Sequence, residues 1–164
     1  MKFIRILALL AVAIGLSACA SKFRTYNGPE VTRVIVEKNT RKMWLLHNDE
    51  VLKQYSIHLG FSPQKHKTTE GDGKTPEGNY IIDRRNPNSR FHLSLGINYP
   101  NEADIAQARE RGVSPGGDIF IHGRPRPWRN GEDDWTWGCI AVTDREMEDI
   151  YAMVKNGTPI TILP

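Results

Sequence analysis

Two short apolar segments, DIFIH at residues 118–122 and GCIAV at residues 138–142, carry the most informative pattern in this sequence. Polar and glycine-rich stretches bound both, which predicts two short buried strands. His122 ends the first strand and Cys139 stands at the start of the second, seventeen positions later (139 − 122). If the two strand ends are neighbours, an imidazole lies beside a thiol.

This pairing of residue types is suited to nucleophilic catalysis. An imidazolium stabilises a thiolate, so Cys139 would be ionised near neutral pH and able to attack a carbonyl carbon. His122 would later return the proton to the leaving amine. Gly138 allows a tight backbone path before the cysteine, with N–H groups directed at a developing oxyanion. The alternative is a structural cysteine, because free cysteine often packs as a small apolar residue.

The flanking sequence predicts a mostly-β protein. A polar turn separates 31–37 from 42–47, and 51–59 follows closely, which predicts an antiparallel meander. Further strands are expected at 79–83, 91–99 and 158–163, with a loop over 84–90 and a short helix over 102–111. We therefore expect an α+β fold with short helices, arranged as a mixed β-sandwich or partly closed barrel.

The last helix has the clearest signals. Thr143 and Glu146 form a capping box, and Gly157 is expected to stop the helix. The residues between them place one apolar face at helical spacing: Met147, Ile150, Tyr151 and Val154.

Composition limits the class of protein. The chain has 164 residues, 39% hydrophobic and 25% charged, with a formal charge of +3. This length and composition suit one folded domain. The charge is small and no basic run or basic–aromatic stripe is present, so nucleic acid is not an expected partner. Two cysteines exclude a disulfide scaffold and a four-cysteine zinc site, although one Cys19–Cys139 disulfide is arithmetically allowed.

The N-terminus resembles a bacterial lipoprotein signal. Lys2 and Arg5 precede an apolar run over residues 6–16, which is short for a bilayer span but typical of a signal sequence. Leu-Ser-Ala-Cys at 16–19 resembles a lipobox, in which Cys19 is lipidated and becomes the new N-terminus. The alternatives are an ordinary signal peptide with a chance cysteine, or a transmembrane anchor.

These features predict three parts: a signal peptide over 1–18, a polar tether over 19–30 and a domain over 31–164. Cleavage would leave 146 residues (164 − 18). Acyl chains on Cys19 would bind membrane lipid. Ala20 is typical of an outer-membrane address, so we expect an anchor in the cell envelope, on the periplasmic face of the outer membrane.

Two separated motifs resemble one known family. His122-Gly123 followed by Thr136-x-Gly-Cys139 resembles the signature of the L,D-transpeptidase (YkuD-type) catalytic domain. The segment GDGKTPEGNY at 71–80 independently resembles that family's upstream Gly-Asp-x-x-Thr-Pro-x-Gly-x-Tyr motif. The two motifs occur in the family's order, and the resemblance covers about residues 31–163.

The resemblance implies roles for four residues. Cys139 matches the nucleophile that is acylated by a peptidoglycan stem peptide, and His122 matches the proton acceptor and donor. Gly123 matches the position whose carbonyl orients that imidazole, and Gly138 with the Cys139 N–H matches the oxyanion turn. The implied reaction acylates the enzyme with the third stem residue, releases D-alanine and transfers the acyl group to an amine. No cofactor or metal is implied, and oligomeric state is not addressed.

The chain departs from the family pattern at two positions. Trp137 stands where a histidine is usual, and Ala141 stands where many members have an arginine that contacts a substrate carboxylate. Arg124, followed by Arg126 and Arg129, could supply that charge, or these residues could form a solvated basic loop. Trp137, with Trp128 and Trp135, could line a substrate groove or pack a loop onto the core.

The departures leave two other functions open. One is a hydrolase of the same fold, either an L,D-carboxypeptidase or an amidase that releases protein from peptidoglycan. The other is a non-catalytic peptidoglycan-binding lipoprotein. The remaining histidines are expected to be structural, with His47 on a turn, His66 in a loop, and His58 and His92 on strands. No His-Glu-x-x-His or paired-cysteine spacing predicts zinc.

Overall fold

A computed structural model describes residues 21–123 and 134–164. Its described elements are one eight-stranded sheet and two helices, so the mostly-β prediction is confirmed. The strands are β1 (Arg33–Glu37), β2 (Lys42–His47), β3 (Glu50–Ser56), β4 (Gly78–Asn86), β5 (Ser94–Ile97), β6 (Phe120–His122), β7 (Ile140–Ala141) and β8 (Pro159–Leu163). The helices are α2 (Glu102–Glu110) and α3 (Asp144–Met153). The predicted signal peptide and Cys19 lie outside the described residues.

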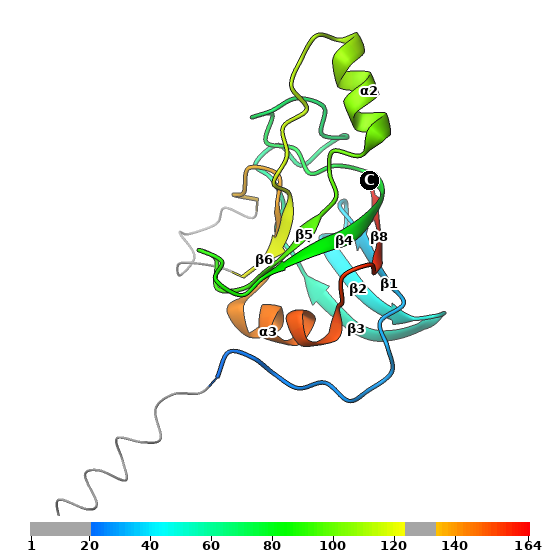
Figure 1. Cartoon of the computed structure of the whole chain (residues 1–164), viewed down its shortest axis with the longest axis vertical. Coiled ribbons are helices and arrows are strands. Elements are labelled where there is room, and N and C mark those ends of the chain that lie inside the picture. The colour runs from blue at the N-terminus through cyan, green and yellow to red at the C-terminus, as the bar shows by residue number, and fades with distance from the viewer. Residues whose placement is uncertain (1–20, 124–133) are drawn as a thin grey trace, which may run out of the picture.

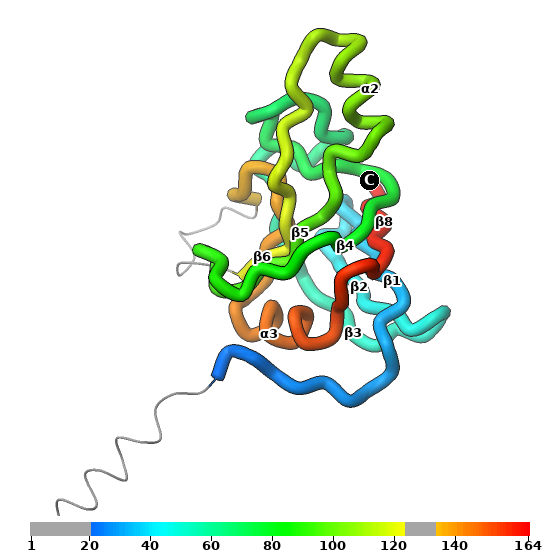
Figure 2. The backbone as a smooth tube through the Cα atoms, viewed as in Figure 1, coloured from blue at the N-terminus to red at the C-terminus, as the bar shows by residue number. Residues whose placement is uncertain are grey.

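The sheet has the strand order β3-β2-β1-β8-β4-β5-β6-β7. The predicted meander is confirmed, because β1, β2 and β3 pair antiparallel. The C-terminal β8 runs parallel to β1 and antiparallel to β4, and so joins the meander to the rest of the sheet. Figures 1 and 2 show that the sheet curls, with the long β4 crossing from one half to the other.

Strand β4 makes this connection by changing partner along its length. Its first residues, 78–81, pair with β8. Its later residues pair with β5 from Ile82 onward, and this second pairing contains a register shift between Ile82 and Arg84. A bulge of this kind bends a strand and increases its twist. The loop expected from residue 84 therefore begins later, because Arg84, Arg85 and Asn86 still pair with β5.

Two predicted strands are shorter than expected. The strand predicted over 91–99 is restricted to β5, because His92 has a φ of 72° and leaves the extended conformation. The strand predicted over 51–59 ends at Ser56, and two isolated bridges follow it, between His58 and Ala141 and between Gly60 and Thr136.

Helix α3 closes the core beneath the sheet. Its capping box is confirmed, since Glu146 N–H donates to Thr143 Oγ1 at 3.3 Å and Thr143 N–H donates to Glu146 Oε2 at 2.9 Å. All four residues of the predicted apolar face are buried. The helix ends at Met153, before Gly157, whose φ of 91° belongs to the turn that leads into β8.

The segment ahead of β1 lies on the domain. A tether was expected over 19–30, yet the described residues 21–30 follow the outside of α3 (Figure 1). Arg24 pairs with Glu148 and Asp149 of that helix, and Tyr26 packs against the hydrophobic core. The expectation rested on polar composition, which does not reveal acidic partners more than 120 residues away along the chain.

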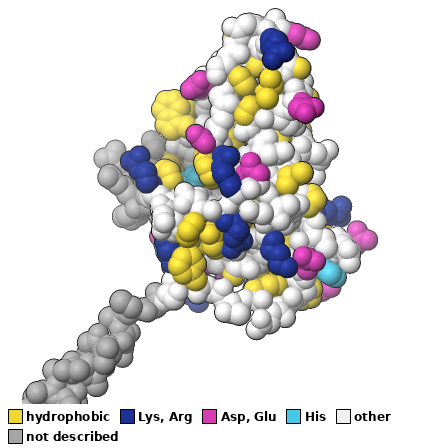
Figure 3. Space-filling model, viewed as in Figure 1, with side chains coloured by type: hydrophobic (Ala, Val, Ile, Leu, Met, Phe, Trp, Pro, Cys, Tyr) yellow, Lys and Arg dark blue, Asp and Glu magenta, His cyan; other side chains and the backbone are white. Residues whose placement is uncertain are grey.

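Charges are distributed evenly on the visible surface. On the face shown in Figure 3, hydrophobic side chains form separate patches, with acidic and basic side chains between them. No helix within residues 21–123 and 134–164 combines the length and apolar character required to cross a bilayer.

Candidate active site

The two segments that hold His122 and Cys139 are adjacent in the sheet. Strands β6 and β7 pair in parallel, with Ile121 opposite Ile140 and His122 opposite Ala141. Cys139 directly precedes β7, so this register brings it level with the start of β6. Its Sγ lies 3.5 Å from the carbonyl oxygen of Asp118. The structure therefore places the two predicted strands side by side, with Cys139 level with the start of β6 and His122 at its end.

The His122 imidazole is held by the backbone carbonyl of the next residue, Gly123. Its Nδ1 lies 2.5 Å from the carbonyl oxygen of Gly123, and because a carbonyl can only accept, Nδ1 carries the proton. In the neutral ring, Nε2 then holds a lone pair that can accept a proton. A side chain at Gly123 would collide with this arrangement, since a Cβ would lie 2.6 Å from Asp144 Oδ1 and 2.8 Å from Phe91 O.

Two aromatic rings enclose the imidazole. Phe91 stacks on His122 with 4.4 Å between ring centroids and 28° between planes. Trp135 meets the same imidazole edge-on at 5.8 Å and 69°. The His122 residue is only 2% exposed as a result. The pattern that predicts a strand over 91–99 does not indicate a role for Phe91 at the site.

The turn before Cys139 depends on Gly138. Its φ of 122° is a conformation that side chains rarely adopt, and a Cβ would lie 2.5 Å from the carbonyl oxygen of Lys74. The buried Thr136 hydroxyl accepts from Gly138 N–H at 3.1 Å and donates to Cys139 O at 2.7 Å. The Gly138 N–H is thus engaged by Thr136, so Gly138 contributes the turn itself rather than a free donor for an oxyanion.

The upstream motif supports this turn from the other side. Asp72 accepts hydrogen bonds from the backbone N–H groups of Thr68, Thr69 and Lys74 at 2.9, 3.1 and 3.0 Å. Its carboxylate also pairs with the buried Lys67 ammonium at 2.9 Å. Burial acts to raise the pKa of Asp72, but these hydrogen bonds outweigh it and lower the pKa below its usual value. Asp72 thereby holds the loop whose Lys74 carbonyl lies against Gly138.

The surroundings of the Cys139 thiol and of the His122 imidazole both shift the pKa toward the uncharged form. Burial raises the pKa of Cys139 to about 11, and although the Phe120 N–H opposes this shift, the nearby Asp118 charge adds to it. Burial also lowers the pKa of His122, which the hydrogen bond to Gly123 only partly offsets. These shifts disfavour the expected thiolate–imidazolium pair, because burial disfavours both charged forms.

Trp137 lies at the surface beside the cysteine. It is 70% exposed and meets the ring of Phe61 edge-on, with centroids 5.0 Å apart. Trp135, in contrast, packs against the site. Packing against the core describes Trp135, and the role of Trp137 in lining a substrate groove stays a prediction.

The second departure from the family pattern lies inside the protein. Ala141 is buried at 1% exposure and exchanges two backbone hydrogen bonds with His58, at 2.8 and 2.9 Å. The charge expected from Arg124, Arg126 and Arg129 cannot be placed, because these residues and Trp128 lie outside the described residues.

The remaining histidines have structural partners. His92 Nε2 lies 3.0 Å from Glu148, and His66 Nε2 lies 3.2 Å from Asp104. His47 is the last residue of β2 rather than part of a turn, and its Nδ1 lies 2.8 Å from Glu30 O. Neither His58 nor His92 lies within a strand. Among the described residues, no three histidine, cysteine or acidic side chains gather as a metal site.

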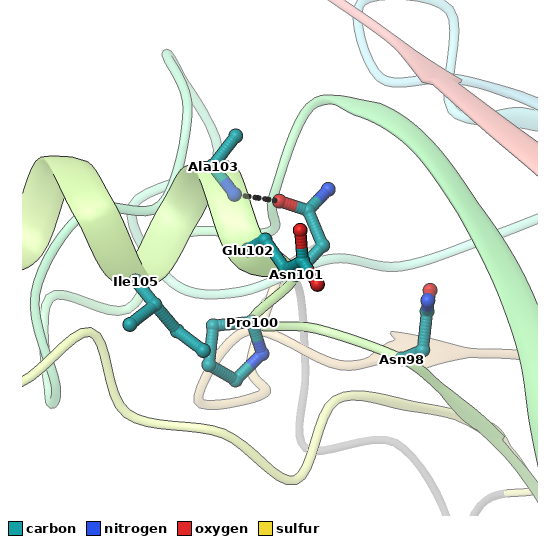
Figure 4. Close-up of a pocket in the computed structure, with 6 residues that line it drawn as sticks. All are labelled: Asn98, Pro100, Asn101, Glu102, Ala103 and Ile105. Atoms are coloured by element: carbon teal, nitrogen blue, oxygen red, sulfur yellow. Dashed lines mark hydrogen bonds between the residues drawn. The ribbon is translucent and has the colours of Figure 1, made fainter.

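A surface hollow lies apart from this arrangement. It borders the start of α2 and is lined by Asn98, Pro100, Asn101, Glu102, Ala103 and Ile105 (Figure 4). The Asn101 side chain accepts from Ala103 N–H at 3.0 Å there and so caps the helix. The hollow includes neither Cys139 nor His122.

Comparison with known proteins agrees with this arrangement. The profile of the YkuD family, the L,D-transpeptidase catalytic domain, matches residues 31–162. The chain is 26% identical over 139 residues to the putative L,D-transpeptidase YafK of Escherichia coli, covering 82% of this chain and 51% of that protein. It is 27% identical over 137 residues to the putative L,D-transpeptidase YkuD of Bacillus licheniformis, covering 80% and 66%. The chain thus spans between half and two thirds of these relatives.

Solved structures show the same fold. The helical cell shape determining protein Pgp2 of Campylobacter jejuni superposes with a TM-score of 0.63 at 25% identity, covering 84% of this chain and 49% of Pgp2. An L,D-transpeptidase from Mycobacterium smegmatis superposes with a TM-score of 0.55 at 17% identity, covering 82% and 59%. The family profile covers most of the chain, and the chain belongs to the YkuD family of L,D-transpeptidase catalytic domains.

Proposed function

We propose that this protein is a peptidoglycan L,D-transpeptidase with Cys139 as its nucleophile. The observation that carries the proposal is the Nδ1–H of His122 bound to Gly123 O, on a strand that pairs with the strand following Cys139. This tautomer leaves Nε2 as the proton acceptor that a cysteine nucleophile needs. Family membership supports the reaction class, and the likeness to the cell shape determining protein Pgp2 supports a role in cell shape.

The reaction starts from the neutral pair. As the Cys139 sulfur attacks the carbonyl carbon of the third stem residue, its proton passes to His122 Nε2. The Cys139 N–H is the proposed donor to the oxyanion. The tetrahedral intermediate collapses, the bond to D-alanine breaks, and the leaving amine takes the proton from His122. The products of this half-reaction are a thioester at Cys139 and free D-alanine.

An amine from a second stem peptide then attacks the thioester. It gives a proton to His122 Nε2, the new amide forms, and the thiol recovers that proton. If water attacks instead, the product is a free carboxylic acid and the enzyme is a hydrolase. Hydrolysis also needs a test, because this chain lacks the arginine that contacts a substrate carboxylate in many family members. Ala141 occupies that position and is buried.

Attachment to the envelope is a separate proposal. The lipobox-like residues 16–19 support lipidation at Cys19 after removal of residues 1–18. We propose that the anchor faces the periplasm from the outer membrane, since Ala20 follows the cysteine. Mass spectrometry of the N-terminal peptide should find acyl chains on Cys19, and a Cys19→Ser chain should carry none. An unmodified Cys19 in mature protein would contradict the anchor.

The central experiment is a muropeptide digest. The full chain is incubated with tetrapeptide muropeptides, and the products are followed by mass. We expect D-alanine release with new cross-linked dimers from the wild type, and no turnover from Cys139→Ala or His122→Ala. The matched control is His47→Ala, a surface histidine that should retain activity. Water adducts without dimers would identify the hydrolase, and folded wild-type protein that releases no D-alanine would refute acyl transfer at this peptide bond.

A further inference from the structure

We propose that residues 21–26, here named the strap, form a positioning element for His122. The strap holds the loop of residues 87–92, whose Phe91 ring stacks on the His122 imidazole. This inference rests on the proposed role of His122 as the proton acceptor. It assigns a part in the reaction to a segment outside the matched family region, which begins at residue 31.

The first contact is made by Lys22. Its Nζ donates to the carbonyl oxygens of Pro87 at 2.6 Å and His92 at 3.2 Å. These carbonyls belong to the two ends of the loop, so a single ammonium group holds both ends. Charged hydrogen bonds of this kind are stronger than neutral ones.

The second contact passes through a carboxylate of α3. Arg24 donates to Glu148 Oε2 through Nη2 at 2.7 Å and through Nε at 3.0 Å. The other oxygen, Glu148 Oε1, lies 3.0 Å from His92 Nε2. One carboxylate therefore connects the strap to the side chain of His92, while Lys22 binds the backbone of the same residue. Figure 1 shows the strap passing along α3 on its way to β1.

The loop depends on such external contacts. His92 has a φ of 72°, a left-handed conformation that is uncommon for residues other than glycine, although histidine adopts it more often than most. Local backbone preference therefore does not favour the observed loop, and contacts from other elements must stabilise it.

The loop acts on His122 in two ways. The Phe91 ring lies 4.4 Å from the imidazole. The Phe91 carbonyl oxygen lies only 2.8 Å from where a Cβ on Gly123 would be, so the loop also packs against the residue whose carbonyl binds His122 Nδ1. Displacing the loop would loosen both the His122 imidazole and the Gly123 carbonyl, which accepts from Nδ1 and so sets the tautomer of that imidazole.

The test compares strap variants in the full chain. In Lys22→Ala combined with Arg24→Ala, we expect kcat for muropeptide turnover to fall about tenfold with KM nearly unchanged, since small misplacements of a catalytic group are costly. The NMR signals of the His122 ring should move as the Phe91 ring current is lost. Its pKa should rise toward the ordinary histidine value as the ring gains water. The single variant Lys22→Arg keeps charged donors at this position, so we expect it to retain most of the wild-type kcat.

Lys155→Ala is the matched control. It removes an exposed ion pair to Glu30, on the same N-terminal segment but away from the loop, and should leave all three measurements unchanged. If the double variant does not fold, Lys22→Met removes the first contact alone and should give a smaller change of the same kind. Unchanged His122 signals and pKa in folded strap variants would overturn the proposal. The NMR measurements need no turnover, so they test the strap even if the muropeptide digest refutes the proposed function.

Discussion

Replacing Gly138 by alanine tests whether the turn before Cys139 is rigid. Two costs follow from the structure. The φ of 122° disfavours any side chain, at about 1–2 kcal/mol. The new Cβ would also lie 2.5 Å from Lys74 O and 3.2 Å from Ile119 Cδ1. Relieving such overlap in a packed region costs about 1–3 kcal/mol more. We expect Gly138→Ala to lower the free energy of unfolding by about 2–5 kcal/mol.

Gly157 provides the matched control. Its φ is 91°, yet a Cβ there would meet no atom within 4 Å. Gly157→Ala should therefore show the conformational cost alone, about 1–2 kcal/mol. The difference between the two variants measures the contact between the turn and the upstream loop.

Urea unfolding followed by tryptophan fluorescence gives both free energies. Alkylation of Cys139 in the folded variants reports on the turn itself, and we expect its rate to change in Gly138→Ala but not in Gly157→Ala. Equal losses of stability in the two variants would refute the reasoning, because they would mean that the Lys74 carbonyl moves away at no cost.

Three other predictions concern the site. Asp72→Asn should lower the free energy of unfolding by about 2–4 kcal/mol at pH 7, because it leaves the buried Lys67 ammonium without its carboxylate. The folded-state pKa of Asp72 lies below its usual 3.8, so the stability that this carboxylate contributes is lost as the pH falls below about 4. In urea unfolding, the difference in unfolding free energy between the wild type and Asp72→Asn should therefore be smaller at pH 3 than at pH 7. The alkylation rate of Cys139 should rise with pH toward a midpoint near 11, and a midpoint below that of free cysteine would contradict a neutral resting thiol. Trp137→Ala should change the free energy of unfolding by less than about 1 kcal/mol, because the side chain is 70% exposed. If the ring contacts substrate, the same variant should raise KM for muropeptides about tenfold. An unchanged KM would exclude that contact.

Local sequence signals predicted most of the elements. The capping box at Thr143 and the apolar spacing after it identified α3, and β-branched runs separated by polar turns identified the meander. Where the predictions failed, a longer-range interaction was responsible. Arg84 continues β4 because it pairs with Gly96 of β5, and residue 92 leaves the strand because contacts from α3 and the strap favour its left-handed conformation.

The candidate site was likewise predictable from the sequence only in part. The spacing of His122 and Cys139, with a glycine beside each, predicted two neighbouring strand ends. Strands β6 and β7 are neighbours, but their parallel pairing leaves Cys139 level with the start of β6 and His122 at its end. The roles of these residues remain proposals. The protonation of the pair was not predictable from spacing, because pKa values depend on burial and on groups brought in by other segments.

The sequence by itself determined the mostly-β class, the family and the two residues around which a reaction can be proposed, because each rests on residue types at short spacing. Only the tertiary structure decided how those residues are held. The Phe91 ring on His122 and the Lys74 carbonyl against Gly138 come from distant parts of the chain. The Lys22 ammonium is a third example, because it binds carbonyl groups of the 87–92 loop that lie 65 and 70 residues further along the chain. Such contacts form when burial and hydrogen bonding bring separate segments together, and no local pattern encodes them.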